Sequence, residues 1–234
     1  MATTQHKKTA SPAGRAAGSS KKTASSSKKA SSSPKKKQAK TYHHGDLRRA
    51  LLDAARVELR AVGFQELSLR GVARRAGVTH TAAYHHFQDR GALLSTIATE
   101  GFIALDQHMA AAMETAGDDA VDRLAASGVG YLKMAVEDPA AYDLMFNGCD
   151  FDVGGELQRV GADPFLRLLR AVEAARAQHG VTHGDALNDA LLQWECVHGC
   201  AMLLRTGQLT RLGVNVDDHA RFVTQRLGAL FRAT

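Results

Sequence analysis

Residues 68–87, SLRGVARRAGVTHTAAYHHF, constrain the fold more than any other stretch of this 234-residue chain. Apolar residues recur at helical spacing on both sides of a central Gly-Val pair, and Gly77 can adopt the left-handed conformation of a tight turn. Ser68 and Thr79 each stand where an N-cap residue begins a helix. The stretch therefore predicts two short helices, Leu69–Ala76 and one that starts after Thr79, joined by a tight turn.

A further helix is expected just before this stretch, over Asp46–Val62. Its leucines and alanines repeat every three or four positions, as a helix with one buried face requires. Gly63 suits the residue that follows a helix, and Phe64 can fold back onto the last turn. Downstream, the apolar pattern predicts a long helix over about residues 91–115. We expect the three shorter helices to pack as one small unit.

The helix after Thr79 turns small or apolar residues inward and polar or aromatic residues outward. Ala83 and Phe87 lie four positions apart on its expected inner face. Such a helix suits the major groove of DNA, and neighbouring arginines can reach the phosphates. The outer-face candidates are His80, Thr81, Tyr84, His85 and His86, and the arginines are Arg70, Arg74, Arg75 and Arg90.

Simpler interpretations of these residues stay open. Many helical hairpins contain a glycine turn, and a pair such as Arg74-Arg75 usually forms a solvated face. The histidines at 80, 85 and 86 could hold a metal ion, although no cysteine or carboxylate pair stands nearby to complete such a site. We expect neither a metal nor a cofactor.

The first 40 residues are strongly basic, and the rest of the chain is not. Residues 1–40 contain ten lysines, one arginine and no acidic residue, a formal charge of +11, whereas the remainder has 19 basic against 24 acidic residues. With no large apolar residue after Met1, this segment is expected to be a disordered tail. A lysine-rich arm would add sequence-independent, salt-sensitive affinity for DNA. A solubilising leader or a wrongly assigned start codon is the alternative.

The chain beyond residue 115 shows helical patterns and no strand pattern, so the expected fold class is all-α. Pro164 is expected at the first position of a helix, where its missing N–H does no harm. The last two helices are apolar enough to bury one side in their own core and the other against a second copy. The expected helices are 121–137, 140–146, 164–179, 185–204 and 217–232, with a glycine-rich loop at 147–155.

Other classes of protein lack support in the sequence. No phosphate-binding loop, dinucleotide-binding loop, nucleophile elbow or carboxylate pair is present, so an enzyme is not expected. No apolar run approaches the roughly 18 residues of a membrane span, and the N-terminus lacks the apolar h-region expected of a signal peptide. Three cysteines offer no disulfide framework, and Cys196 and Cys200 are more simply buried thiols than a redox or metal sensor. A cytoplasmic protein is expected.

The region from Gly45 to about Phe102 resembles the DNA-binding domain of TetR-type transcriptional regulators. The motifs that carry the resemblance are AARVELRAVGF at 54–64 and LSLRGVARRAGVTHTAAYHHFQDRGALL at 67–94. The resemblance implies that Tyr84 and Arg90 grip phosphates and that residues 79–81 lie nearest the bases. By position, Arg70, Thr79, Thr81, Tyr84, His86 and Arg90 would approach DNA. Lys or Arg, Gly and Thr are common where this chain has His80, Thr81 and Ala82, which leaves the operator sequence open.

The resemblance also implies a ligand-binding hollow between the central helices and a four-helix dimer interface made by the last two helices. Each ligand candidate could instead be ordinary core, because methionine and aromatic stripes normally are. Trp194, His198 and Gly199 are similar to the W-x-x-x-H-G-like motif of one sensor-domain subgroup. The ligand candidates are Tyr131, Met134, Tyr142, Met145, Phe146, Phe165, Trp194 and His198.

The sequence thus predicts a ligand-responsive regulator, most simply a repressor, that binds a palindromic operator as a homodimer and is released by a small effector. The expected domains are a basic tail at 1–40, a DNA-binding domain at 41–102 and a sensing and dimerisation domain at 103–234. The alternative is a nucleoid-associated architectural protein that binds DNA through its tail. Double-stranded DNA is the expected partner in either case.

Overall fold

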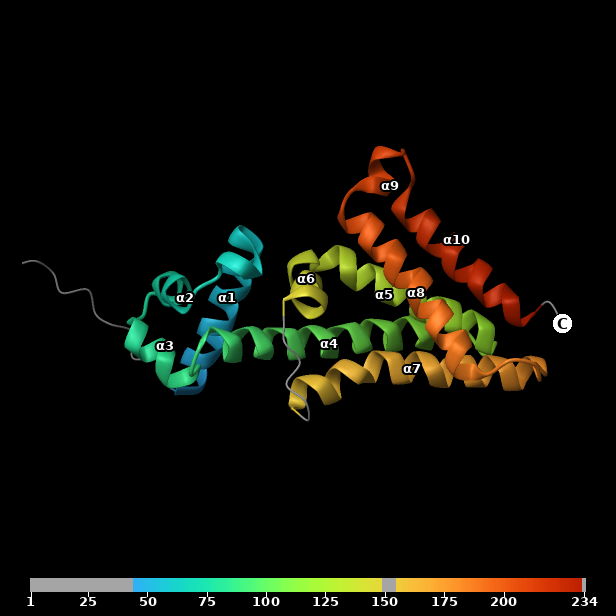
Figure 1. The fold of residues 1–234 in the computed structure, drawn as a ribbon, viewed down its shortest axis with the longest axis horizontal. Helices are drawn as coiled ribbons and strands as arrows, with labels where there is room; N and C mark the ends of the chain where they lie inside the picture. The colour runs from blue at the N-terminus through green and yellow to red at the C-terminus, as the bar shows by residue number, and fades with distance from the viewer. Residues whose placement is uncertain (1–43, 149–154, 233–234) are drawn as a thin grey trace, which may run out of the picture. The chain divides into compact units, whose positions relative to one another are not determined.

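Every regular element is helical in residues 44–148 and 155–232, the part of the chain that this computed structural model describes (Figure 1). The predicted all-α fold class is confirmed there. The basic tail expected at 1–40 lies outside the described residues, as does most of the glycine-rich loop expected at 147–155. No helix in the described ranges is both long and apolar enough to cross a membrane.

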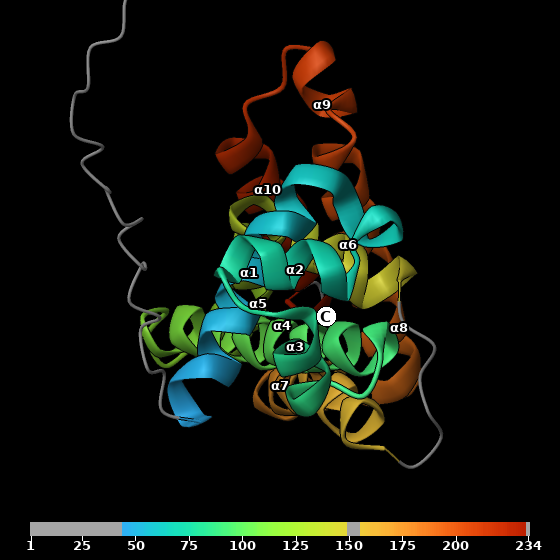
Figure 2. The ribbon, with the colours of Figure 1, turned by 90° about the vertical axis from the view of Figure 1, so that its left-hand side faces the viewer.

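Three helices form the expected small unit: α1 (His44–Glu66), α2 (Leu69–Ala76) and α3 (His80–His86) (Figure 2). Gly63 interrupts α1 with φ 76°, so its first segment ends at the expected glycine. Ser68 Oγ accepts a hydrogen bond from the backbone N–H of Gly71 at 3.1 Å. Thr79 Oγ1 accepts one from Ala82 at 3.2 Å, so both predicted N-caps are confirmed.

The turn between α2 and α3 depends on Gly77, whose φ of 72° lies in the left-handed region. The N–H of Gly77 donates to the carbonyls of Ala73 and Arg74, and that of Val78 donates to Ala73. These carbonyls lack partners within α2, so the bonds end the helix and fix where α3 begins. Beneath the turn, Ala83 of α3 is fully buried in the core.

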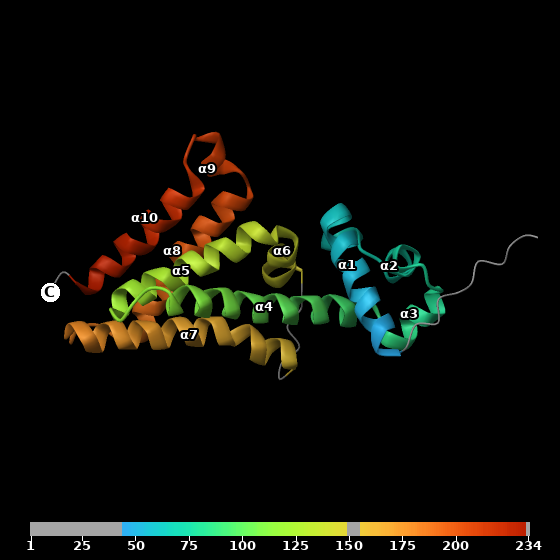
Figure 3. The same cartoon turned by 180° about the vertical axis from the view of Figure 1, so that it is seen from behind.

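The long helix α4 (Arg90–Glu114) begins beside this unit and continues along α5 (Ala120–Glu137) and α7 (Glu156–His179) (Figures 1 and 3). Asp89 caps it, because Asp89 Oδ1 accepts a hydrogen bond from Ala92 N–H at 2.7 Å. The helix is continuous across residue 102, the expected domain boundary. The two regions therefore share one rigid element.

The start of α7 differs from the expectation. The helix begins at Glu156, and Pro164 lies inside it rather than at its first position. Leu157 and Val160 are both buried, and their burial favours continuing the helix upstream of the proline. Pro164 removes one backbone hydrogen bond but is buried beside aromatic side chains. The prediction of a helix that starts at Pro164 is wrong.

The remaining elements are α6 (Pro139–Asn147), α8 (Ala186–Arg205), α9 (Gln208–Arg211), α10 (Val216–Gly228) and a 3-10 turn (Ala229–Phe231). The single turn α9 was not expected, and the last α-helix ends at Gly228 rather than at 232. Helix α10 packs closely on α5, because a β-carbon at Gly128 would lie 2.6 Å from Thr224. This contact ties the C-terminal helix to the central bundle.

Candidate functional site

The outer face of α3 presents His80, Thr81, Tyr84 and His85 to solvent, and we call these four residues the α3 face. Tyr84 is 47% exposed, and its ring meets that of His80 edge to face at a centroid distance of 5.0 Å. His86 is half-buried at the edge of this face. An exposed arc of donors, acceptors and a phenol ring on a short helix is suited to contacts with base edges and phosphates.

The arginines of α2 do not all have the same surroundings. Arg70 and Arg74 are exposed and have no ion pair among the described residues. Arg75 pairs with Glu58 of α1, whose Oε2 lies 2.7 Å from Arg75 Nε and 2.6 Å from Nη2. The same carboxylate lies 2.9 Å from where a β-carbon at Gly71 would be, so a larger residue at this position would displace the end of the Glu58 side chain. Sequence inspection did not single out Glu58 or Gly71, although a glycine inside an eight-residue helix was an available signal.

Arg90 lies at the first position of α4 and holds the connection between α1 and α2. Its Nε donates to the Leu67 carbonyl at 2.9 Å, and its Nη2 donates to the carbonyls of Phe64 and Gln65. A guanidinium has five N–H donors, so these bonds leave further donors on Nη1. Arg90 therefore helps to position the unit formed by α1–α3, and a contact with phosphate would be additional to that task.

The second candidate site is a group of polar and aromatic side chains from α5, α6, α7 and α8, in which Tyr131 and Tyr142 are buried. The hydroxyls of Tyr131 and Tyr142 each lie 2.8 Å from Nδ1 of His198 and 3.1 Å from one another. These three atoms form a triangle, and their hydrogen-bonding needs are met when one hydroxyl donates to Nδ1 and the other donates to the first hydroxyl. We call the set Tyr131, Tyr142, Phe146, Phe165, Trp194 and His198 the aromatic cluster.

Burial keeps the polar members of the aromatic cluster uncharged near neutral pH. Loss of solvation raises the pKa of Tyr131 to about 12 and raises the pKa of Tyr142 further. The same effect lowers the pKa of His198 below its ordinary value. Desolvation disfavours the charged form of every one of these groups. The centre of the cluster is therefore a neutral hydrogen-bonding environment.

The other aromatic rings surround this triangle. The ring centroid of Phe146 lies 4.7 Å from that of His198, and Trp194 lies 6.0 Å from His198 and 5.6 Å from Phe165. A cavity of about 70 Å³ opens between Phe102, Tyr131, Phe146, Phe165 and Trp194. It is smaller than the few hundred Å³ that a drug-sized ligand needs, so an occupant has to displace these rings.

Two of the eight ligand candidates lie elsewhere. Met134 lines a hollow between α1, α4, α5 and α6, with Arg56, Glu100 and His108. Met145 is fully buried against α4, where a β-carbon at Gly101 would lie 2.6 Å from its sulfur. The other six, from α5, α6, α7 and α8, come together in the aromatic cluster.

Arg205 at the end of α8 adjoins the aromatic cluster, and sequence reasoning missed it. Its side chain is 11% exposed, and its guanidinium carbon lies 5.5 Å from the centroid of the Tyr142 ring. It also pairs with Asp143 and donates to the Pro139 carbonyl, which ties α8 to α6. A single arginine at the end of the apolar run CAMLL was the available signal.

Helix α6 connects the aromatic cluster with the unit formed by α1–α3. Tyr142 and Phe146 belong to the cluster, while the two ends of α6 contact α1. At its start, the Asp138 carboxylate pairs with Arg60 at 3.7 Å. At its end, a β-carbon at Gly148 would lie 2.8 Å from the Phe64 ring. A displacement of α6 therefore has to be accommodated by α1.

Helices α8 and α10 leave large apolar side chains in solvent. A β-carbon at Gly199 of α8 would have no atom within 4 Å, so another helix could approach closely there. Single exposed apolar residues are ordinary, but several on neighbouring elements are typical of an interface. The exposed residues are Leu187, Leu192 and Leu203 on α8, Leu212 after α9, Phe222 on α10 and Leu230 in the 3-10 turn.

Within the described ranges, no three histidine, cysteine or acidic side chains gather closely enough to hold a metal ion. His80 and His85 belong to the solvent-facing arc of α3. Cys200 is buried, which raises the pKa of its thiol, and Cys196 is half-buried. Burial of Cys200 favours an unreactive thiol.

Two known protein families match parts of this chain. Residues 51–97 match the family described as bacterial regulatory proteins, tetR family, and residues 124–227 match the family described as tetracyclin repressor-like, C-terminal domain. An uncharacterized helix-turn-helix transcriptional regulator of Haemophilus influenzae is 46% identical over 63 residues, which cover 26% of this chain. The match spans 31% of that curated relative's length.

Solved structures resemble almost the whole described chain. A protein of unknown function from Rhodococcus sp. RHA1 is 34% identical, with a TM-score of 0.72 over 81% of this chain and 97% of that one. PfmR of Thermus thermophilus, described as a TetR family transcriptional regulator, has a TM-score of 0.61 over 76% of this chain and 96% of its own. It is 15% identical, so its likeness concerns the fold alone.

Proposed function

Since this chain belongs to the TetR family of bacterial transcriptional regulators, we propose that it is a repressor that binds a palindromic operator as a homodimer. A small-molecule effector releases it. The α3 face carries the proposal, because caps at Ser68 and Thr79 and the turn at Gly77 hold an exposed polar helix in place. Such regulators act on DNA in the cytoplasm, at the nucleoid, and catalyse no reaction.

The proposed DNA contacts divide into base reading and phosphate binding. Residues 79–81 at the start of α3 lie nearest the base edges, and His85 and His86 follow on the same helix. Tyr84 donates its hydroxyl to a phosphate, and Arg70 adds a charged contact from α2. Arg90 reaches a phosphate through Nη1 while its other donors hold the α1–α2 connection. Contacts with base edges determine which DNA sequence is recognised, and contacts with phosphates fix the register of the protein on the duplex.

Dimerisation is proposed through α8 and α10. Two copies related by a two-fold axis would bury the exposed leucines of α8 and Phe222 of α10 in a four-helix interface. The pairing places two α3 helices in successive major grooves, with half-site centres about 34–36 Å apart or slightly more.

The proposed effector site is the aromatic cluster, with Met134 and Met145 as flanking candidates. The cluster keeps Tyr131, Tyr142 and His198 uncharged, so it favours a neutral molecule with one hydrogen-bonding group. Trp194 and His198 meet there, which supports the proposed likeness to the W-x-x-x-H-G subgroup of sensor domains. Phe146 of α6 lines the 70 Å³ cavity, so we propose that an effector enlarges the cavity by moving Phe146.

Release follows from the position of α6 between cluster and α1. A shift of Tyr142 and Phe146 disturbs the Arg60–Asp138 pair and the contact of Phe64 with Gly148. The two α3 helices then no longer fit successive grooves. A tenfold loss of operator occupancy needs an affinity difference of only about 1.4 kcal/mol between the two states.

Selection of genomic DNA fragments by the purified full chain tests the proposal. Recovered fragments should share an inverted repeat, and Thr81→Ala should weaken or relax its recognition, while Thr115→Ala at the far end of α4 serves as the matched control. Recovery of fragments with no common sequence would refute the proposal that the protein is a sequence-specific regulator.

The second candidate function is sequence-independent DNA packing, favoured by the +11 charge of residues 1–40. In our proposal this arm strengthens binding to flanking DNA without choosing the site. Deleting residues 1–40 should keep operator selectivity and reduce the slope of log affinity against log salt. Loss of all DNA binding in the truncated chain would favour the architectural protein.

A further inference from the structure

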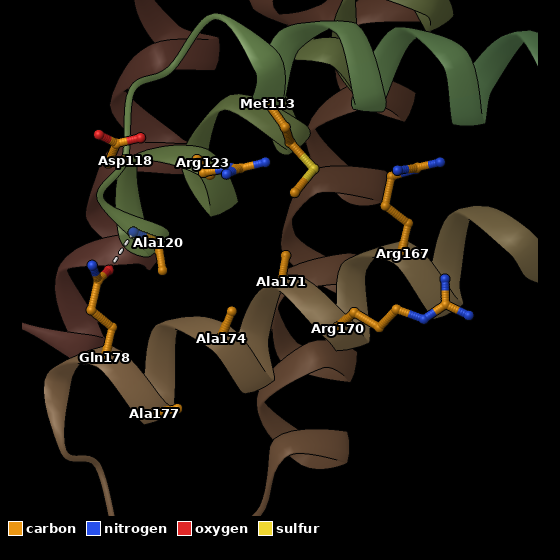
Figure 4. Close-up of a pocket in the computed structure, with 10 residues that line it drawn as sticks. All are labelled: Met113, Asp118, Ala120, Arg123, Arg167, Arg170, Ala171, Ala174, Ala177 and Gln178. Carbon is orange, nitrogen blue, oxygen red and sulfur yellow. Dashed lines mark hydrogen bonds between the residues drawn. The ribbon is translucent and has the colours of Figure 1, made fainter.

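A large open groove lies outside the aromatic cluster, between the end of α4, the start of α5 and α7 (Figure 4). Its volume is about 710 Å³, within the range of small-molecule sites, and it shares no lining residue with the 70 Å³ cavity. The groove therefore offers a second place for a ligand. The residues that line it include Met113, Arg123, Arg167, Arg170, Ala171 and Ala174.

The middle of the groove is apolar. The methyl groups of Ala171 and Ala174 on α7 face the thioether of Met113 on α4 (Figure 4). Ala174 is exposed, and Met113 is half-buried against the core. A hydrocarbon chain laid between these side chains would remove apolar surface from water on both sides.

Three guanidinium groups border this apolar strip. Arg123 and Arg170 are exposed and have no ion pair among the described residues. Arg167 is held in place, because its Nε and Nη2 donate to the two oxygens of Asp106 at 2.6 and 2.7 Å. That pairing raises the pKa of Arg167 and leaves its Nη1 without a bond to described residues. A guanidinium with a fixed orientation is well suited to binding a carboxylate.

The charges around the groove are unevenly distributed. Asp118 lies at the end opposite to Arg167 and Arg170, beside the hydrogen bond from Ala120 N–H to Gln178 Oε1 (Figure 4). Arg123 extends from α5 toward Met113 (Figure 4). Arg167 is paired with Asp106, so among the described residues Arg170 supplies the unpaired positive charge at that end, and Arg123 supplies another on the side of Met113 that faces Asp118 (Figure 4). An anionic group is therefore favoured near the arginines and disfavoured beside Asp118.

We propose that this groove binds an amphipathic organic carboxylate. Its carboxylate lies against Arg167 and Arg170, and its hydrocarbon body lies along Met113 and the alanines of α7, bordered by Arg123. The aromatic cluster excludes such a ligand, because a charge buried beside Tyr131 and His198 would lose its solvation. The ligand would bridge α4 and α7, so it is a second input to the helix that α1–α3 share with the sensing region.

Binding of octanoate to the full chain, measured by isothermal titration calorimetry, tests the proposal. Octanoate should bind, and its affinity should fall as salt is added, while octanol and acetate bind at least tenfold more weakly. The double variant Arg123→Glu/Arg170→Glu should reduce octanoate affinity at least tenfold, since both side chains are exposed and the fold does not depend on them. Arg159→Glu, an exposed arginine of α7 outside the groove, is the control.

A second variant separates the apolar strip from the charges. Ala174→Phe fills the exposed middle of the groove and should weaken octanoate at least fivefold without lowering the unfolding midpoint. Equal affinity for octanol and octanoate, equal loss in Arg159→Glu, or unchanged binding in both groove variants would overturn the proposal. No octanoate binding at millimolar concentration would also overturn it and leave the groove to a protein partner.

Discussion

Tyrosine and histidine meet in two regions of this molecule, with opposite surroundings. On α3 the rings of His80 and Tyr84 lie 5.0 Å apart in solvent, and both side chains are exposed. In the aromatic cluster the hydroxyl of Tyr142 lies 2.8 Å from Nδ1 of His198, and Tyr142 is fully buried. The same side-chain chemistry is offered to a partner in one region and used internally in the other.

The difference shows that burial decides what a polar aromatic side chain does. An exposed hydroxyl exchanges water for a ligand at little cost, so it can contribute to binding without contributing to folding. A buried hydroxyl needs its partner for the folded state to form, and a ligand that takes the partner away changes the fold around it. The α3 face is therefore suited to binding DNA, and the cluster is suited to sensing.

The largest expected difference between the two regions is in how much each tyrosine contributes to the free energy of unfolding. Tyr142→Ala should lower the free energy of unfolding by about 3–5 kcal/mol, because it removes a buried ring. Tyr84→Ala should change it by no more than about 0.5 kcal/mol, because Tyr84 is exposed. Urea denaturation measures both, and similar losses in the two variants would contradict the comparison.

Alkaline pH should destabilise the protein through the cluster. The pKa of Tyr131 is about 12 when folded and 10.0 ordinarily, so the unfolded chain loses this proton first as pH rises. Below pH 10 this group contributes about 2–3 kcal/mol to the free energy of unfolding, and that contribution is lost as pH rises through 12. Urea denaturation from pH 8 to 12 should show a flatter profile for Tyr131→Phe. Tyr84→Phe is the control, and equal flattening in it would argue against the assignment.

Operator binding should depend on the exposed pair and not on the buried one. Tyr84→Phe removes a hydroxyl proposed to contact a charged phosphate and should weaken operator binding about tenfold, or ~1.4 kcal/mol. Tyr142→Phe should leave the affinity within about twofold when no effector is present. Fluorescence anisotropy with a labelled operator measures both, and the reverse order of effects would break the comparison.

Acid pH should have the smallest effect, through His198, which is only half-buried. Burial lowers its pKa, so the unfolded chain takes up a proton that the folded chain resists. The contribution of His198 to stability is therefore present above its ordinary pKa of 6.5 and is lost as pH falls below that value. The groups that face His198 are Tyr131 and Tyr142, with Arg205 beyond the Tyr142 ring.

Thermal unfolding of wild type and His198→Gln measures this effect. The stability difference between the two should shrink between pH 7.5 and pH 5, because the variant lacks the titrating ring. His80→Gln, which alters an exposed histidine, is the control. A difference that grows toward acid pH would show that His198 is stabilised in its charged form.

Local patterns predicted the DNA-facing unit closely. The caps at Ser68 and Thr79 and the left-handed Gly77 depend on neighbours within a few residues, so the sequence contains their cause. The start of α7 was not predictable in this way. The local preference of Pro164 for a helix start lost to the burial of Leu157 and Val160.

The sequence by itself determined the all-α class, the DNA-facing unit and the residue types available for a sensing site. The tertiary structure decided which of them meet: it joins Tyr131, Tyr142 and His198 from three helices and places Met134 in another hollow. It also added Arg205 to the cluster and opened the groove beside Arg167. Helix formation and capping are short-range, whereas burial and charge pairing depend on how distant helices pack.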